Sequence, residues 1–253
     1  MSSTSLNSKD QSIRSEHNEK VQAVGQDGDY IILGNNKYLK EDIAKVLATA
    51  YTGWRPANAA ALGLVSFGIT AFVLTLYLAG AKDITAPNAA VGAAVFYGGL
   101  VEILVGAWCF FLGDTLFFTV FISLGAFWLS FAAIYLPAFG IIEAYALNDP
   151  TQLGSAIGFY MIAWGLVCTV VALATMKLNL MLFLFFVFLV LLFYLLAAAY
   201  FTGSSKCVTA GASFGFIASI ISLYMGLSLA ISKQNCYVSL PLVEFPKPKF
   251  TLI

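Results

Sequence analysis

Six long apolar runs, joined by short polar links, follow a polar N-terminal stretch of the chain. Each run is roughly 20 residues long, which is the length that an α-helix needs to cross about 30 Å of hydrocarbon at a rise of about 1.5 Å per residue. The hydrophobic pattern places the runs at residues 58–78, 90–112, 116–136, 154–176, 178–201 and 209–231. The sequence therefore predicts an all-α membrane protein, built as a bundle of six transmembrane helices.

The polar N-terminal stretch divides into two parts. Residues 1–30 are rich in Ser, Asn, Asp, Glu, Lys and Gln and lack apolar periodicity, which is typical of a disordered arm. Residues 30–33 are suited to a short extended segment, and residues 38–50 have the pattern of a short amphipathic helix. We therefore expect a cytoplasmic arm with this amphipathic segment, a six-helix transmembrane domain and a cytoplasmic tail, at residues 1–51, 52–236 and 237–253.

The links between the runs predict which helices are neighbours and how the bundle is oriented. Residues 113–115 alone separate the second and third runs, and Lys177 alone separates the fourth and fifth, so each pair should be antiparallel. Basic residues precede the first run and follow the last, and the positive-inside rule then puts both termini in the cytoplasm. Lys82 and Lys206 fall on the opposite side, against the rule.

Composition supports the membrane assignment and narrows the function. Hydrophobic residues make up 60% of the chain and charged residues only 10%, whereas soluble domains carry about 25% charged residues. Thirteen basic and thirteen acidic residues give no net charge and no basic stripe for nucleic acid. The single histidine, His17, and four scattered cysteines predict no metal site. No catalytic dyad or phosphate-binding loop occurs, so we expect neither an enzyme nor a cofactor.

Three polar residues near or inside the runs could carry chemistry. Glu102 lies well within the second run, where a carboxylate costs several kcal/mol, so it is either a protonatable site or a neutral acid hydrogen-bonded between helices. Glu143 follows the third run and is either an entrance residue or a solvated loop acid. Asn58 opens the first run, where it either caps the helix or marks a helix start that attracts an anion.

Several motifs in the right order resemble those of the acetate uptake transporter family, specifically the fungal ammonia/acetate transport outward proteins. Residues 58–64 read NAAALGL, where the family signature is NPAPLGL, so both prolines are lost. Residues 96–101, FYGGLV, resemble the family's second-run motif, and residues 127–135, FWLSFAAIY, resemble its third-run motif. The resemblance covers most of the chain, from about residue 30 to residue 238.

This resemblance implies a transporter or channel for acetate and similar small monocarboxylates, with proton linkage. It also implies a plasma-membrane protein that assembles as a homo-oligomer, a trimer or a hexamer, with one substrate path in each protomer. The family's narrow hydrophobic constriction falls on Phe67, Leu124 and Leu189. The remaining expected roles are a vestibule and substrate contacts at Asn58, Leu62, Gly63, Tyr97 and Trp128, and proton or gating sites at Glu102 and Glu143.

Departures from the family pattern affect the expected mechanism. Leu124 stands where the family constriction has a tyrosine, so the ring offers no hydroxyl and should be drier, or wider and more tolerant of longer acids. Cys109 and Gly113 occupy a stretch where family members carry a glutamate, while Glu102 stands where relatives carry glutamine. An ionised Glu102 would repel an anion, so this side chain must be protonated, paired or off the path.

Two other functions stay open at this point. The names of the fungal relatives imply an ammonium exporter, for which acidic residues such as Glu102, Asp114 and Glu143 are candidates. The lost prolines and the lost tyrosine also fit a sensor or scaffold that no longer transports. Uptake of labelled acetate, compared with release of ammonia, separates these hypotheses.

Overall fold

The computed structural model of the protein describes residues 21–22, 30–33, 36–52, 56–84, 86, 88–231 and 236–242. The chain divides into two compact units, Met1–Ala57 and Asn58–Ile253. We describe each unit by itself.

The N-terminal unit contains a small antiparallel sheet and one helix. Strands β1 (Val21–Gln22), β2 (Tyr30–Leu33) and β3 (Asn36–Leu39) pair in that order, and Ile31 faces Tyr38 across β2 and β3. Helix α2 (Lys40–Thr52) follows, and Lys45 forms an ion pair of 2.9 Å with Glu41 one turn earlier. The expected extended segment and amphipathic helix are therefore present.

One part of this unit differs from the sequence-based expectation. Strand β1 lies inside the stretch expected to be a disordered arm, and its residues Val21 and Gln22 pair with Leu33 and Ile32 of β2. The pairing gives the apolar Val21 a cross-strand neighbour, which a search for long periodic patterns does not detect. The rest of the expected arm, up to residue 29, lies outside the described residues.

The second unit holds the membrane-spanning helices. Within the described part of the chain, six helices are long and apolar enough to cross a membrane, as predicted. The spans are α3 (Ala59–Leu78), the composite helix 88–111, α6 (Thr115–Tyr135), α8 (Gln152–Thr175), α9 (Leu180–Thr202) and α10 (Ser205–Ala230).

Polar residues in the short links set where the spans begin. Asn58, Asp114, Asn179 and Ser204 each stand directly before a span, and each side chain accepts a hydrogen bond from a backbone N–H of the first turn. Ser204 explains why α10 begins earlier than the predicted start at Thr209. The hydrophobic run begins later than the helix because the first turn of α10 is polar.

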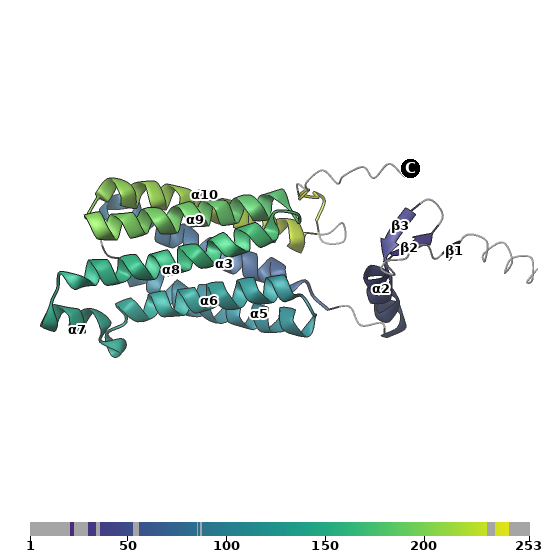
Figure 1. Ribbon diagram of the computed structural model, residues 1–253, viewed down its shortest axis with the longest axis horizontal. Helices are drawn as coiled ribbons and strands as arrows, with labels where there is room; N and C mark the ends of the chain where they lie inside the picture. The colour runs from purple at the N-terminus through teal and green to yellow at the C-terminus, as the bar shows by residue number, and fades with distance from the viewer. Residues whose placement is uncertain are drawn as a thin grey trace, which may run out of the picture. The chain divides into compact units, whose positions relative to one another are not determined.

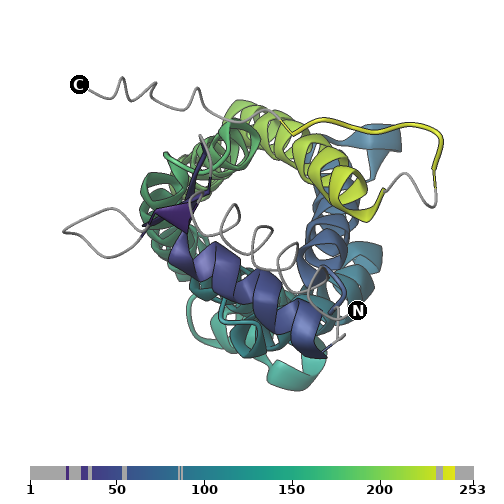
Figure 2. The ribbon, with the colours of Figure 1, turned by 90° about the vertical axis from the view of Figure 1, so that its right-hand side faces the viewer.

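The spans form a closed ring when the bundle is viewed from its end (Figure 2). Around this ring α3 packs on α10, α10 on α9 and α9 on α8, while α5 packs on α6 and on α3. A hydrogen bond of 2.7 Å between the hydroxyls of Ser130 on α6 and Tyr160 on α8 joins the two remaining neighbours. Sequential helices lie side by side along the bundle in Figure 1, so the two tight links do join antiparallel neighbours.

The second span is not one regular α-helix. It consists of α4 (Asn88–Ala93), a π-helical segment η2 (Ala94–Val101) and α5 (Glu102–Phe111). A Cβ atom on Gly99 would lie 2.7 Å from the carbonyl oxygen of Ala94, and one on Gly125 of α6 would lie 3.0 Å from that of Gly99. Glycine at both positions therefore allows the wide π turn and a backbone-to-backbone approach of the second and third spans.

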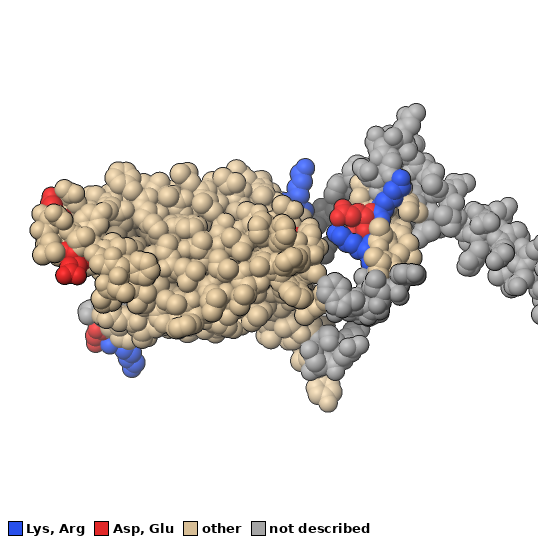
Figure 3. Space-filling model, turned by 90° about the horizontal axis from the view of Figure 1, so that it is seen from below, with Lys and Arg blue, Asp and Glu red and all other residues tan. Residues whose placement is uncertain are grey.

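Short helices and charged residues mark the ends of the bundle. A helix that the hydrophobic pattern did not predict, α7 (Ile141–Asn148), follows the 3₁₀ turn η3 (Pro137–Phe139) between the third and fourth spans. Another 3₁₀ turn, η1 (Ala81–Asp83), follows α3 at the same end. In the face shown in Figure 3, Lys, Arg, Asp and Glu side chains of the bundle lie at its two ends and leave the flank between them uncharged. This distribution is that of a multi-pass membrane protein.

Candidate functional site

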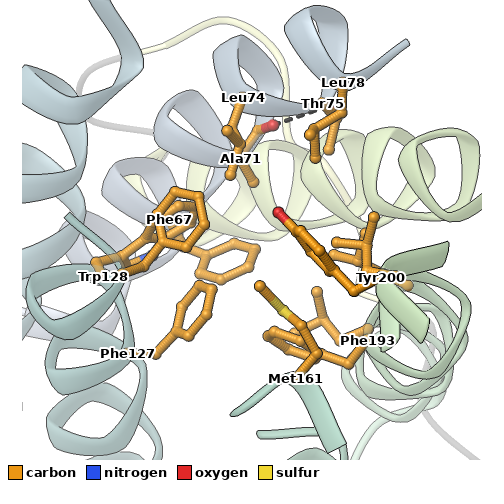
Figure 4. Close-up of a pocket in the computed structure, with 14 residues that line it drawn as sticks. Phe67, Ala71, Leu74, Thr75, Leu78, Phe127, Trp128, Met161, Phe193 and Tyr200 are labelled. Carbon is orange, nitrogen blue, oxygen red and sulfur yellow. Dashed lines mark hydrogen bonds between the residues drawn. The ribbon is translucent and has the colours of Figure 1, made fainter. Parts of the chain in front are cut away.

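A small cavity with a volume of about 30 Å³ lies inside the ring of helices. Its walls come from α3, α6, α8 and α9 (Figure 4). The cavity begins near the middle of the spans at Phe67 and Leu189 and extends to Leu78 and Tyr200, close to the end of the bundle that carries α7. The cavity thus lies in the half of the bundle toward α7, and aromatic side chains bound it at mid-span.

Aromatic rings close the cavity at mid-span. The ring of Phe67 lies 5.7 Å from that of Trp128 and 5.0 Å, edge to face, from that of Phe185, measured between centroids. Phe127 in turn packs 5.1 Å from Trp128 and 5.0 Å from Phe193. Tilted and edge-to-face pairs at these distances hold each other in place, so the mid-span closure is a packed cluster of side chains.

The three residues of the expected constriction do not share one position. Phe67 is 3% exposed and Leu189 is completely buried, and both line the cavity. Leu124 is also buried, but it is not among the described residues that line the cavity. Trp128, which lies one turn further along α6, contributes to the wall instead. The α6 side of the closure is therefore built by an indole.

Few polar atoms face this cavity. Thr75 donates its hydroxyl proton to its own helix, at 2.7 Å from the carbonyl oxygen of Ala71. The indole nitrogen of Trp128 is buried and has no hydrogen-bond partner among the described residues. The hydroxyl of Tyr200 lies 3.5 Å from that of Tyr135. A solute in the cavity would meet almost wholly apolar walls and, toward the α7 end, the Tyr200 hydroxyl.

Glu102 is completely buried at the start of α5, directly after the π-helical segment. Neither of its carboxylate oxygens has a hydrogen-bond partner within the part of the chain that the structure describes. It lies one turn after Gly98, where a Cβ atom would contact Trp128 at 2.7 Å and Thr70 at 2.9 Å. The expected alternative of an interhelical hydrogen bond is thus not formed, and the side chain does not line the cavity.

The other expected site residues lie elsewhere in the bundle. Asn58 is exposed, and its side-chain oxygen accepts a hydrogen bond of 3.2 Å from the backbone N–H of Ala60, so it acts as a helix cap. Leu62 is 49% exposed, whereas Gly63 is buried directly against the ring of Phe121. None of these lines the cavity that the structure describes.

Two further expected residues, Tyr97 and Glu143, also lie outside the described cavity wall. Tyr97 is partly buried in the π-helical segment and does not belong to the described wall of the cavity. Glu143 is exposed in the first turn of α7, near the end toward which the cavity extends. In the link after α7, hydrogen bonds from Thr151 and Gln152 favour the ionised form of Asp149 and lower the pKa of that carboxyl. This end of the bundle therefore carries acidic groups, together with the exposed Lys82 and Lys206.

Sequence reasoning missed most of the cavity wall. On α9 the lining residues follow Leu189 at helical spacing, and on α3 they follow Phe67 in the same way. The missed residues are Ala71, Leu74, Thr75, Leu78, Phe127, Phe131, Met161, Leu192, Phe193, Leu196 and Tyr200. Counting three or four residues onward from Phe67 and Leu189 would have found Ala71, Leu74, Leu192, Leu196 and Tyr200. The contribution of α8, through Met161, gave no comparable signal.

Comparison with known proteins tests this interpretation. A sequence profile described as the GPR1/FUN34/yaaH family matches residues 44–247. The chain belongs to this family. The resemblance inferred from the motifs is thereby confirmed, and so is the expected all-α membrane fold.

Among the proteins similar to this chain, two relatives and one solved structure are named for transport. The ammonia transport outward protein 2 of Saccharomyces cerevisiae is 39% identical, over 87% of this chain and 80% of that protein. Acetate permease A of Emericella nidulans is 33% identical, over 75% of this chain and 67% of that protein. The solved structure of the bacterial acetate channel SatP superposes with a TM-score of 0.65 at 29% identity, over 74% of this chain and 99% of that one.

Proposed function

We propose that this protein passes acetate and similar small monocarboxylates across a membrane, through the cavity inside its ring of helices. The observation that carries the proposal is the apolar cavity bounded by aromatic rings at mid-span, in a fold shared with a bacterial acetate channel. Acetate permease A of Emericella nidulans, at 33% identity, supports the same class of substrate. The assignment makes the protein a transporter or channel and not an enzyme.

The geometry suggests how the path selects its solute. A dry, aromatic-lined closure excludes a hydrated ion but admits a small molecule whose alkyl part contacts apolar walls. In our proposal Phe67 and Leu189 form the constriction together with the ring of Trp128, while Leu124, also expected there, is buried outside the described cavity wall. We also propose vestibule roles for four residues that lie outside the described cavity wall: Asn58, Leu62, Gly63 and Tyr97.

Proton linkage is the second part of the proposal. Glu102 is the candidate, because its buried carboxyl has no fixed partner and lies one turn from the glycine that packs on Trp128. An acidic side chain inside a membrane is energetically costly, and such side chains commonly mark the path of a proton or a solute. Glu143, at the end where the cavity opens, is the proposed gating residue. We further propose a homo-oligomer, trimer or hexamer, in the plasma membrane with both termini cytoplasmic.

Ammonium export is the competing function, and a specific observation favours it. The Saccharomyces cerevisiae protein at 39% identity is named for outward ammonia transport. A fully buried acid and acidic groups at the α7 end would suit a cation better than an anion. A sensor or scaffold that has lost transport is the third hypothesis, motivated by the missing signature prolines.

Labelled acetate uptake by proteoliposomes of the purified protein, with and without an inward proton gradient, tests the proposal. Leu189→Trp should lower uptake at least tenfold, because the larger side chain fills the closure. Leu191→Trp is the matched control, since Leu191 is on the same helix, is 38% exposed and does not line the described cavity. If acetate uptake is no greater than that of empty liposomes and the protein releases ammonium, the proposal is wrong and the protein is an ammonium exporter.

A further inference from the structure

The α7 end of the cavity contains a polar group that has no role in the proposed constriction. Tyr200 lies near the C-terminal end of α9, and its side chain forms part of the cavity wall. Figure 4 shows the ring reaching across the cavity, with its hydroxyl oxygen directed toward Ala71 and Thr75 of α3. The hydroxyl is therefore presented to a solute that enters from this end.

The hydrogen-bonding capacity of this hydroxyl is not used up by the protein. Its partner is the hydroxyl of Tyr135 on α6, at 3.5 Å, which is longer than the distance of about 2.5–3.0 Å usual for O–H···O bonds. The nearby hydroxyl of Thr75 is already committed to carbonyl oxygens of its own helix, at 2.7 Å from Ala71 and 3.2 Å from Phe72. Among the described residues that line this level of the cavity, Tyr200 thus supplies the available hydroxyl proton.

Packing holds the pair in position before any solute arrives. The ring of Tyr135 lies 5.1 Å, between centroids, from that of Phe131 on the preceding turn of α6. A Cβ atom on Gly154 of α8 would lie 3.1 Å from the carbonyl oxygen of Tyr200, so α8 and α9 approach closely at that residue. Because Tyr135 does not line the described cavity, its hydroxyl can orient that of Tyr200, which can donate to one oxygen of a carboxylate.

The surroundings of the pair fit the rest of a short monocarboxylate. The wall beside Tyr200 consists of aliphatic side chains, among them Leu74, Leu78 and Leu196. A methyl or short alkyl group would lie against these residues while its carboxylate met the Tyr200 hydroxyl, and a second charged group would find no partner there. We infer that Tyr200, with Tyr135 as its positioning residue, forms a carboxylate-binding site at the α7 end of the cavity.

This inference rests on the proposed function and adds a step to it. Leu124 supplies no hydroxyl at mid-span, so a carboxylate would otherwise lose its hydration shell against apolar walls. The Tyr200 hydroxyl replaces part of that shell before the anion reaches the closure. Tyr200 in this way supplies, at the α7 end of the cavity, the hydroxyl that the constriction lacks.

Tyr200→Phe removes the hydroxyl and keeps the ring. Acetate binding to the purified protein, measured by calorimetry, should weaken about tenfold, as expected for loss of a hydrogen bond to a charged group. Tyr135→Phe should weaken binding less, about threefold, and raise the half-saturation concentration of uptake without changing its maximal rate. Tyr194→Phe is the control, because its hydroxyl lies 3.3 Å from that of Thr169 and it does not line the described cavity.

The outcomes separate this inference from the proposed function. If wild-type protein takes up acetate and Tyr200→Phe binds it as tightly as Tyr194→Phe does, the carboxylate site is wrong and the transport function stands. If wild-type protein binds acetate in a Tyr200-dependent way but does not pass it, the site stands and the transport function is wrong. If wild-type protein neither binds nor passes acetate, both are wrong.

Discussion

Two buried polar side chains near mid-span lack hydrogen-bond partners within the described residues, Glu102 and Trp128. Buried polar groups without partners are rare because each costs on the order of 1–3 kcal/mol, and more when the group is charged. Both side chains lie around Gly98, which contacts Trp128 directly and precedes Glu102 by one turn. Their position beside the closed part of the cavity suggests that a proton and a solute, which the protein binds in turn, supply the missing interactions.

Replacing Glu102 by glutamine tests the proton role at the scale of one residue. The amide keeps the shape of the side chain and removes its exchangeable carboxyl proton. We expect acetate uptake by proteoliposomes to continue but to lose its stimulation by an inward proton gradient. Glu143→Gln, at an exposed position on α7, should keep the stimulation. Gradient-stimulated uptake that persists in Glu102→Gln and disappears in Glu143→Gln would reverse the two assignments.

At the scale of elements, glycines and one serine allow α3 and α10 to pack closely. A Cβ atom on Gly68 would lie 3.1 Å from the carbonyl oxygen of Ser219, and one on Gly226 would lie 3.0 Å from that of Ala61. Ser222 of α10 donates a hydrogen bond of 2.7 Å to the carbonyl oxygen of Leu64 on α3. In lipid, where apolar burial gives helices little reason to associate, such close contacts and interhelical hydrogen bonds hold the pair together.

Gly226→Val should therefore destabilise the bundle. The new side chain would meet Val65 Cγ2 at 2.7 Å and the α3 backbone at 3.0 Å, and overpacking of this kind costs about 1–3 kcal/mol. We expect the Tm in detergent, followed by intrinsic fluorescence, to fall by about 5 °C. Gly92→Val is the control, since a Cβ atom there meets nothing within 4 Å. Equal melting temperatures for the two variants would show that α3 and α10 can separate without loss of stability.

The elements were predictable from sequence to different degrees, for physical reasons. Span lengths follow from the thickness of the hydrocarbon, and caps such as Asn179 fix the helix starts, so the six spans were found within a few residues. The π turn in 94–101 was not found, because it depends on the approach of Gly125 from another helix. Helix α7 was not found because it is too short and exposed to give a strong pattern.

The candidate site was less predictable than the spans. Almost every residue of α9 is apolar, so the hydrophobic pattern cannot show which face lines a cavity inside the bundle. The family resemblance supplied Phe67 and Leu189, which do line it, and Leu124, which does not. Sequence alone could not reveal that the indole of Trp128 takes that position, because this depends on how α6 is rotated against Gly98.

At the scale of the whole molecule, orientation decides what the tyrosine pair does. Tyr200 and α7 lie at the same end of the bundle, and six spans put the start of α3 and the end of α10 at the other end. Basic residues of the sequence concentrate before the first span and after the last, which predicts that the α7 end faces outward. The carboxylate site would then meet acetate that arrives from outside, and the closure would lie beyond it.

Cysteine labelling in intact cells tests this orientation. In a chain whose four cysteines are replaced by alanine, Glu143→Cys at the α7 end should react with a membrane-impermeant maleimide. Lys177→Cys, which is exposed between α8 and α9 at the opposite end, should react only after the cells are permeabilised. The reverse result would put the Tyr200 site at the cytoplasmic mouth, where it would collect carboxylate for release from the cell. An outward-facing pair therefore argues for uptake, and an inward-facing pair argues for export by the same path.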